Sequence, residues 1–372
     1  MSGLFEHGLV IGKFYPPHAG HHFLIRSAAS SCRRVTVVVM AADVESIPLS
    51  ARVSWLREAY AEQPHVGITG VVDNIPVDYA DAEVWDGHVA LMREGIAAGQ
   101  NHGVAVDAVF SSEGYGQELA RRFDAADVRL DAPRGTFPVS GTAVRRDPTA
   151  HWLELDAGVR AWFAKRVVVI GAESTGTTTL SQDLAAALRM RGGLHAVTGW
   201  VGEYGRELTA AKLAAARGRA ARAGQPEPTV FDLEWTDDDF VDVVIRQTAD
   251  EDRWARLGGP VLVCDTDALA TTVWQERYMG RTTAEVAQIA AELPPRALYI
   301  LTGDADVPFH DDGLRDGEHL RGWMTQRFRD VLAAGDTPWI EVGGDRDKRL
   351  RSAMEAVDAL LDEGWRLADP LG

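Results

Sequence analysis

Twice along this chain of 372 residues, a short apolar run rich in valine and isoleucine ends at a glycine and gives way to a helix-forming segment. The first run is GLVIG at residues 8–12, and the second lies within KRVVVIG at residues 165–171. Apolar runs of this kind are typical of strands that are buried on both faces of a parallel sheet. A strand, a glycine-bearing loop and a helix, in that order, begin a βαβ unit. The repetition therefore predicts two parallel α/β domains, each with its own first loop.

Further elements continue the pattern in both halves. Additional strands are predicted at residues 34–40, 105–112 and 128–131, and then at 260–267, 297–304 and 338–342. Helices are predicted at about 20–30 and at 84–98. The pattern restarts after Pro148, which places the domain boundary near residues 155–165. The sequence thus predicts an α/β chain of two doubly wound parallel sheets, with domains at residues 1–158 and 159–372.

Charge and cysteine content narrow the function classes. The formal net charge is −17, whereas binding to a nucleic-acid backbone needs a basic face, so we expect no nucleic-acid partner. Cys32 and Cys264 form neither a disulfide framework nor a zinc pattern, which favours a reducing, cytoplasmic location. No apolar run approaches the roughly 18 residues of a membrane span, and the N-terminus does not read as a signal peptide. We therefore expect no membrane association. The alanine-rich residues 210–224 are expected to form an exposed helix or a mobile loop.

The loop after the first strand carries a pattern suited to phosphate. His18 and His21, three positions apart in GKFYPPHAGHH, share a face of the first turn of the expected helix. Gly20 lets a ligand approach the backbone closely. Ligands of parallel sheets bind at the carboxyl ends of strands, and a helix N-terminus presents unpaired N–H groups to phosphate. Imidazoles in this position can donate hydrogen bonds to phosphate oxygens, and a turn with surface histidines is the alternative.

This motif resembles the (H/T)xGH signature of the nucleotidyltransferase superfamily. The longer stretch GKFYPPHAGHHFLI is similar to the adenylyltransferase domain of NadR-type bifunctional proteins, which join nicotinamide mononucleotide (NMN) adenylyltransferase to ribosylnicotinamide kinase. The second superfamily signature, ISGTxxR, has its counterpart in VSGTAVRRDP at residues 139–148. There Ser140 is suited to cap a helix, and Arg145 to offer a fixed cationic fork to the same phosphates.

The resemblance implies further ligand contacts in the first domain. FSSEGYGQEL at residues 110–119 resembles the family's adenosine-side loop, with Ser111, Glu113 and Gly114 as its contacts. Trp85 is suited to stack on a nicotinamide ring, and core packing is an equal alternative. The rest of the implied ATP- and NMN-binding set lies within the two motifs: Gly12, Lys13, Phe14, Tyr15, Gly20, Ser140, Gly141 and Thr142.

The implied reaction is adenylyl transfer, in which the phosphate of NMN attacks the α-phosphorus of ATP to give NAD and pyrophosphate. It needs no enzyme nucleophile, so catalysis rests on positioning and charge stabilisation. His18, His21 and Arg145 would hold the phosphates, with ATP as co-substrate and Mg²⁺ on its β- and γ-phosphates. The (H/T)xGH motif alone leaves other substrates open: pantetheine phosphate, FMN or nicotinic acid mononucleotide.

The second glycine loop, GAESTGTTTL at residues 171–180, is close to the P-loop pattern G-x-x-x-x-G-K-[ST]. Thr178 matches the hydroxyl that holds Mg²⁺, but Thr177 stands where the pattern has lysine. The backbone cradle does not depend on that side chain, so we expect ATP to bind here still. The predicted contacts are Gly171, Glu173, Ser174, Thr175, Gly176, Thr177, Thr178 and Thr179.

Later segments resemble the kinase half of the same family. Its EYGRE segment matches VGEYGREL at residues 201–208, where Glu203 would be the base or ligand for the ribose 5′-hydroxyl. Tyr204 and Arg206 would line the same pocket. Asp265, which ends a predicted strand, is suited to hold Mg²⁺ through water as a Walker B aspartate does.

Other kinase residues are implied around the riboside and in a lid. Asp267 is an alternative ribose contact. The family's DDGLR matches HDDGLRD at residues 310–316, which contains Asp312 and Arg315. Arg315, Arg321 and Arg327 could each reach the phosphates and replace the missing lysine.

Over residues 8–365 the resemblance implies a cytoplasmic enzyme of NAD salvage that makes NMN from nicotinamide riboside and NAD from NMN. Thr177 leaves a second interpretation open, in which the C-terminal domain is a nucleotide sensor with little or no catalysis. Some family members carry an N-terminal helix-turn-helix repressor domain. This chain begins at the adenylyltransferase strand, and we expect it to lack that domain. The sequence leaves open the oligomeric state, including a homo-oligomer, and the choice between amide and acid substrates.

Overall fold

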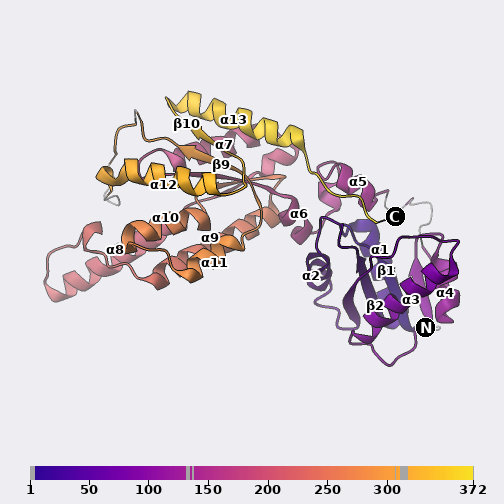
Figure 1. The fold of residues 1–372 in the computed structure, drawn as a ribbon. Coiled ribbons are helices and arrows are strands. Elements are labelled where there is room, and N and C mark those ends of the chain that lie inside the picture. Colours follow the sequence, from indigo (N-terminus) through magenta and orange to yellow (C-terminus); the bar gives the residue numbers. More distant parts are fainter. Residues whose placement is uncertain (1–4, 131–134, 136–137, 306, 311–316, 372) are drawn as a thin grey trace. The chain divides into compact units, whose positions relative to one another are not determined.

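The computed structural model describes residues 5–130, 135, 138–305, 307–310 and 317–371. The chain divides into two compact units, one formed by Met1–Val159 with Trp365–Gly372 and the other by Arg160–Gly364. In each unit, helices flank a central parallel sheet (Figure 1), which confirms the predicted α/β class. The chain from Trp365 onward groups with the first unit, whereas the sequence-based division had assigned it to the second domain.

The first unit contains a parallel sheet with the strand order β3-β2-β1-β4-β5. Its strands are β1 (Phe5–Gly12), β2 (Cys32–Ala41), β3 (Val66–Val72), β4 (Ala108–Ser111) and β5 (Ala126–Arg129). Its helices are α1 (Ala19–Ser31), α2 (Leu49–Ala59), α3 (Ala82–Ala97), α4 (Gly116–Phe123) and α5 (Gly141–Arg146), followed by a 3₁₀ turn, η1 (Trp152–Glu154). The helix α6 (Ala157–Phe163) spans the boundary between the units. The sequence missed β3.

Successive residues of β1 point into different cores, as the pleat of a strand requires. Val10 packs in a cluster with Val37 of β2 and with residues of α1 and α2. Leu9 packs in a second cluster with Val38 and with residues of α3 and α4. Both faces of the sheet are therefore covered by helices, which explains why these strands lack alternating polar residues.

The second unit contains a parallel sheet with the order β10-β9-β6-β8-β7. Its strands are β6 (Lys165–Gly171), β7 (Gly199–Val201), β8 (Val261–Asp265), β9 (Arg296–Thr302) and β10 (Trp339–Val342). Its helices are α7 (Thr177–Met190), α8 (Tyr204–Ala223), α9 (Asp237–Leu257), α10 (Ala268–Met279), α11 (Ala284–Ala291), α12 (Arg321–Ala334) and α13 (Arg346–Glu363). The 3₁₀ turns are η2 (Gly193–Val197), η3 (Val230–Asp232) and η4 (Glu318–Leu320).

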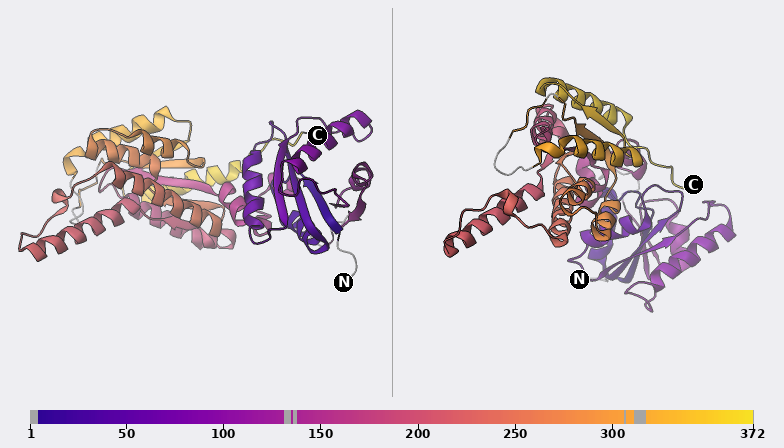
Figure 2. Two further views of the ribbon diagram at one scale, coloured as in Figure 1. Left: turned by 90° about the horizontal axis from the view of Figure 1, so that it is seen from below. Right: turned by 60° about the vertical axis from the view of Figure 1, so that its left-hand side comes forward.

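The core of the second unit lies on its sheet, and α8 reaches away from it. Residues of α7 and α13 pack together against β6, β8 and β9. The far end of α8 projects from the rest of its unit in both views of Figure 2, and its buried residues are Leu213 and Ala220. The alanine-rich segment is thus an exposed helix, one of the two structures predicted for it. Within the described part of the chain, no helix is both long enough and apolar enough to cross a membrane.

Candidate active sites

In the first unit, residues of both predicted motifs line one pocket. His18, Gly20 and His21 follow β1, and Ser112 and Glu113 follow β4. Another wall comes from Val139, Ser140 and Gly141 at the start of α5, and Phe23, Leu24 and Leu130 add apolar surface. β1 and β4 are neighbours in the sheet but not in the sequence, because the chain first builds β2 and β3 on the other side. Such a reversal of strand order is where parallel α/β sheets bind ligands.

The two predicted histidines stack beside each other at the start of α1. Their ring centroids are 3.8 Å apart. His18 is the N-cap, and its Nδ1 accepts a hydrogen bond of 3.2 Å from the Gly20 N–H. A neutral His18 ring therefore carries its hydrogen on Nε2, which makes that atom a donor suited to a phosphate oxygen. His22 has a structural contact instead: its Nε2 lies 2.5 Å from Asp156 Oδ2, with the side chain almost fully buried.

Tyr15 joins the two motifs. The guanidinium of Arg145 donates to the Tyr15 carbonyl at 2.7 Å and lies 4.7 Å from the centroid of its ring. A Cβ added to Gly141 would come within 2.9 Å of that carbonyl oxygen, so the close approach requires glycine. A second Arg145 nitrogen donates to the hydroxyl of Thr142 at 3.2 Å. The fork of Arg145 is therefore held in place by residues of both motifs.

The last described residues of the chain lie on the first motif. Ala368 accepts a hydrogen bond from the Tyr15 hydroxyl at 2.9 Å and donates one to the Ser46 hydroxyl at 2.8 Å. The Lys13 ammonium donates to the Leu371 carbonyl at 2.5 Å and to Glu45 at 3.1 Å. Sequence reasoning missed this tail (Trp365–Leu371), because no motif marks its contacts.

Several predicted contacts of the first unit do not line this pocket. Trp85 is packed in the core cluster of α3 and donates through Nε1 to the Tyr79 carbonyl at 3.2 Å, so core packing describes it and ring stacking does not. Ser111 is buried against Gly116, where an added Cβ would lie 1.9 Å from its hydroxyl, and its neighbour Ser112 lines the pocket instead. Phe14 is also buried, in a left-handed backbone conformation with φ of 46°. Gly12, Lys13, Tyr15, Gly114, Thr142 and Arg145 are not among the lining residues described, and Thr142 and Arg145 instead line a separate pocket with residues of the tail.

The P-loop of the second unit follows β6 and has the glycine geometry that the motif requires. Gly176 has φ of 89°, which only glycine adopts readily. A Cβ on Gly171 would lie 2.2 Å from the Thr302 hydroxyl and 2.6 Å from that of Thr175. Thr175 is fully buried and hydrogen-bonds to Thr302, so it supports the loop from below. Thr179 is exposed and is not among the described lining residues.

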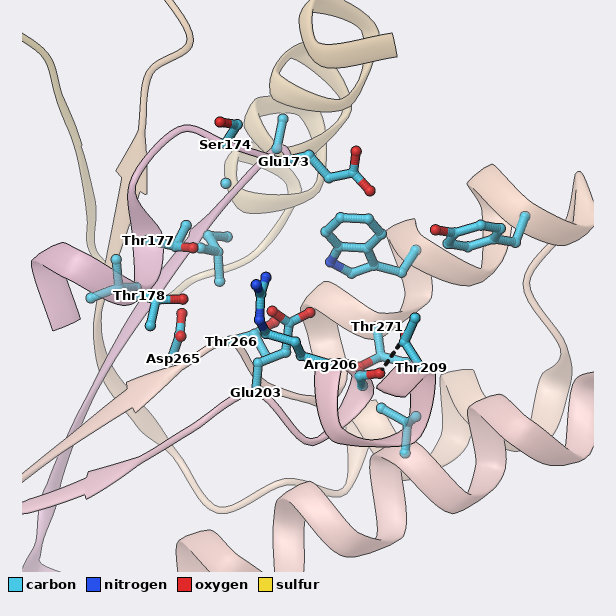
Figure 3. Close-up of a pocket in the computed structure, with 18 of the residues that line it drawn as sticks. Glu173, Ser174, Thr177, Thr178, Glu203, Arg206, Thr209, Asp265, Thr266 and Thr271 are labelled. Carbon is cyan, nitrogen blue, oxygen red and sulfur yellow. Dashed lines mark hydrogen bonds between the residues drawn. The ribbon is translucent and has the colours of Figure 1, made fainter. Parts of the chain in front are cut away.

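The loop opens onto a pocket in which the predicted kinase residues gather (Figure 3). Glu173, Ser174, Thr177 and Thr178 line one side, where Asp265 lies beside Thr178, and Glu203 and Arg206 lie across from these threonines. Asp265 ends β8 and is 2% exposed. Burial raises the pKa of this carboxyl to about 6, while hydrogen bonds from Thr178 and Thr177 and the charge of Arg206 act in the opposite direction.

Two acidic side chains at this end of the loop differ in their surroundings. The carboxylate of Glu203, at the N-cap position of α8, points into the pocket in Figure 3. The carboxylate of Glu173 is already bound by neighbours, because it accepts from Arg277 at 2.7 Å and from the Gly317 N–H at 2.8 Å. Ser174 accepts from the His310 N–H at 2.7 Å, which connects the P-loop to the segment after β9.

An aromatic wall completes this pocket, and the sequence analysis did not find it. Its members are Trp235, Phe240, Trp274 and Tyr278. Trp235 and Tyr278 have ring centroids 5.2 Å apart, and Trp274 stacks on Tyr278 at 6.4 Å. The rings come from the loop before α9, from α9 and from α10, and a spacing of four between Trp274 and Tyr278 is the signal that could have placed two of them on one helix face.

Four kinase predictions are wrong or only partly right. Asp267 is fully buried and does not reach the riboside side: it caps α10 and accepts from Arg296 at 2.9 Å and from the Tyr299 hydroxyl at 2.7 Å. The hydroxyl of Tyr204 bonds to Asp242 at 3.1 Å, and Tyr204 is not among the described lining residues. Arg321 donates to backbone carbonyls, and Arg327 pairs with Glu276 at 2.8 Å. Neither arginine lines the pocket. Asp312 and Arg315 lie outside the described residues.

Comparisons with known proteins found matches to the second unit and to nearly the whole chain. A family model described as an AAA domain matches residues 166–349. The trifunctional NAD biosynthesis/regulator proteins NadR of Salmonella typhimurium and Escherichia coli K12 are each 24% identical over 374 residues, which is 96% of this chain and 83% of theirs.

Solved structures of NadR share the fold. A crystal structure of NadR in complex with NAD and AMP-PNP matches with a TM-score of 0.68 and 23% identity, over 96% of each chain. A complex with NR matches with a TM-score of 0.70 and 23% identity, over 99% of each chain. The two parallel sheets and their order along the chain are therefore those of that fold.

Proposed function

Because this chain is homologous to NadR over 96% of its length, and is thereby an enzyme of NAD metabolism that binds nucleotides, we propose that it carries two activities of NAD salvage. The first unit would transfer the adenylyl group of ATP to NMN, giving NAD and pyrophosphate. The second unit would transfer the γ-phosphoryl group of ATP to nicotinamide riboside, giving NMN and ADP. ATP would be the co-substrate of both reactions.

The convergence of both motifs on one pocket carries the adenylyltransferase assignment. A phosphate oxygen of NMN forms a bond to the α-phosphorus of ATP, and the bond from that phosphorus to the pyrophosphate oxygen breaks. His18 and His21 would donate hydrogen bonds to the phosphate oxygens, and Arg145 would hold charge that develops on the leaving pyrophosphate. All three side chains are fixed by neighbours, so they would act by preorganised electrostatics and not as nucleophiles.

Incubation of the intact chain with NMN, ATP and Mg²⁺ tests this activity, and we expect NAD and pyrophosphate in equal amounts. A panel containing nicotinic acid mononucleotide, FMN and pantetheine phosphate should rank below NMN in kcat/KM. Absence of both products with every acceptor would refute the adenylyltransferase assignment, while a faster rival acceptor would correct only the substrate.

The position of Glu203 opposite the P-loop carries the kinase assignment. Its carboxylate points into the space between the loop and the aromatic wall (Figure 3), where the 5′-hydroxyl of a riboside would meet the γ-phosphate of ATP. Glu203 would accept the hydroxyl proton as the oxygen forms its bond to the γ-phosphorus and ADP leaves. The aromatic wall suits a planar pyridine ring.

The oxygen groups beside the P-loop fit a magnesium ion. Asp265 and the hydroxyl of Thr178 are adjacent, and Mg²⁺ prefers such hard oxygen ligands while it keeps several waters. Burial opposes ionisation of Asp265, and a divalent cation next to it would favour the ionised form. Thr178 and Asp265 would hold the ion, which would neutralise charge on the ATP phosphates.

We expect replacement of Trp274 by alanine to raise the KM for nicotinamide riboside roughly 3- to 10-fold, because ring stacking contributes about 0.5–1.5 kcal/mol beyond area burial. The measurement is riboside-dependent ADP formation at varied riboside concentrations. Trp274→Phe should retain most of the affinity, and Trp323→Ala, at an exposed tryptophan of α12, is the matched control. An unchanged KM in Trp274→Ala would show that the riboside does not bind against this wall.

Thr177 favours one alternative, in which the second unit binds nucleotide but transfers no phosphate. That nucleotide sensor would bind ATP with an affinity that Thr178→Ala weakens, yet it would form no ADP when riboside is added. Riboside-dependent ADP formation that disappears in Asp265→Ala would exclude the sensor. In the intact chain, ADP reports the kinase reaction and pyrophosphate the adenylyl transfer, so the two units can be assayed together.

A further inference from the structure

The P-loop of the second unit lacks the lysine that neutralises the transferring phosphoryl group, because Thr177 occupies its position. We propose that Arg206, from the first turn of α8, supplies this positive charge from the opposite wall of the pocket. This inference rests on the proposed kinase reaction and identifies the cation that the reaction needs.

The composition of the pocket singles out this residue. Among the described residues that line the pocket, Arg206 is the one with a positive charge. Nearby arginines face other partners: Arg349 donates to the carbonyl of Thr175 at 2.6 Å, beneath the loop. Arg277 pairs with Glu173 at 2.7 Å, and Arg321 donates to the carbonyl of Val307 at 2.9 Å. None of these three lines the pocket.

The direction of the Arg206 side chain fits the task. In Figure 3 its guanidinium extends from α8 toward the P-loop threonines and lies beside the carboxylate of Glu203. A γ-phosphate cradled by the loop must face Glu203 to meet the acceptor hydroxyl, so its oxygens would lie next to this guanidinium. The charge of Arg206 also acts on the pKa of Asp265, which agrees with its position at the phosphate end of the pocket.

One buried side chain connects the start of α8 to the end of β8, where Asp265 lies. Gln247 of α9 is 1% exposed. Its carbonyl accepts from the Tyr204 N–H at 3.0 Å, and its amide nitrogen lies 3.5 Å from the carbonyl of Thr266, the residue after Asp265. The first turn of α8 and the end of β8 therefore both bond to Gln247, so the scaffold helps to position Arg206 relative to Asp265.

An arginine in this position can do what a P-loop lysine does. Its guanidinium can donate two parallel hydrogen bonds to phosphate oxygens. In the transfer step the riboside oxygen forms a bond to the γ-phosphorus, the bond to the ADP oxygen breaks, and the hydroxyl proton passes to Glu203. Arg206 makes no covalent bond and stabilises the charge on the transferring group.

The test compares Arg206→Ala with the double variant Thr177→Lys/Arg206→Ala in the intact chain. We expect Arg206→Ala to lower the kcat of riboside-dependent ADP formation by about 10²–10³-fold, the cost of losing one preorganised electrostatic donor. The double variant has lysine at its usual P-loop position, and its kcat should be at least tenfold higher than that of Arg206→Ala. Arg206→Lys should fall between the wild type and Arg206→Ala. Arg222→Ala removes the same charge from the last turn of α8 and should change nothing.

Two results would overturn the assignment: Arg206→Ala within threefold of the wild-type kcat, or an inactive Arg206→Ala that Thr177→Lys does not rescue. If the wild type forms no ADP, the proposed kinase reaction fails, and the assignment of Arg206 is then judged by binding. The affinity of the P-loop site for ATP, identified as the isotherm that Thr178→Ala weakens, should also weaken in Arg206→Ala and recover in the double variant. An isotherm that Arg206→Ala leaves unchanged would refute a phosphate contact.

Discussion

Glu203→Gln should lower riboside-dependent ADP formation by about 10²–10⁴-fold, the usual contribution of a positioned general base. The substitution keeps the size and the hydrogen-bonding reach of the side chain but removes its ability to accept a proton. The loss should therefore appear in kcat, with the affinity for ATP changed little. NAD formation from NMN should be unaffected, because Glu203 belongs to the second unit.

Glu207→Gln is the matched control, since Glu207 lies in the first turn of the same helix and is exposed. If Glu203→Gln retains kcat within threefold of the wild type, Glu203 is not the base. A large rise in KM for riboside with kcat unchanged would instead make Glu203 a substrate ligand.

His21→Ala should lower NAD formation from NMN by about 10²–10³-fold, because it removes one donor from the pocket where both motifs of the first unit meet. His18 also caps α1, so its contribution is best tested with asparagine, which keeps a capping acceptor but lacks the imidazole. His18→Asn should show a loss of similar size with an unchanged thermal unfolding midpoint.

His102→Ala, at an exposed histidine of the same unit, should leave NAD formation unchanged. Loss of activity together with a lowered unfolding midpoint would attribute the effect to folding and not to phosphate contacts. NAD formation at the wild-type rate in both His21→Ala and His18→Asn would show that neither histidine contributes to the reaction.

The two α/β domains could be predicted from the sequence because their strands, glycine loops and helices are each marked by a short stretch of consecutive residues. β3 was missed for a non-local reason. Its sequence, VGITGVV, contains glycines that weaken a strand signal. A Cβ at Gly70 would lie 2.8 Å from side-chain atoms of both Leu49 and Val53, so the glycine is there to let α2 pack on the strand.

In the P-loop site, the position of a residue at the end of a strand was predicted correctly. The position of a residue beyond the following turn was not. Asp265 ends β8 and reaches the pocket as expected. Thr266 then adopts φ of 69°, and Asp267 begins α10 as its N-cap, with its carboxylate bound to buried partners. The segment DALATT carries a recognisable N-cap signal, which could have favoured the capping interpretation over a ribose contact.

The aromatic wall and the role inferred for Arg206 depend on which helices face the P-loop, and no short motif encodes that. Trp235 and Trp274 are distant in sequence, and each looks like an ordinary core residue when read alone. Arg206 was predicted to line the pocket, but the residues predicted to replace the P-loop lysine were Arg315, Arg321 and Arg327. The fastening of α8 by Gln247 is a tertiary contact that only the structure reveals.

The tail sets the order in which the contacts of the first unit can form. Lys13, Tyr15 and Ser46 are synthesised before residues 160–364, whereas their partners at Ala368 and Leu371 are synthesised after them. The first unit to be synthesised is therefore the last to make all its contacts. A chain that stops anywhere within the second unit lacks the segment that contacts the GKFYPP loop, so only chains that include Ala368 and Leu371 can assemble that part of the first unit.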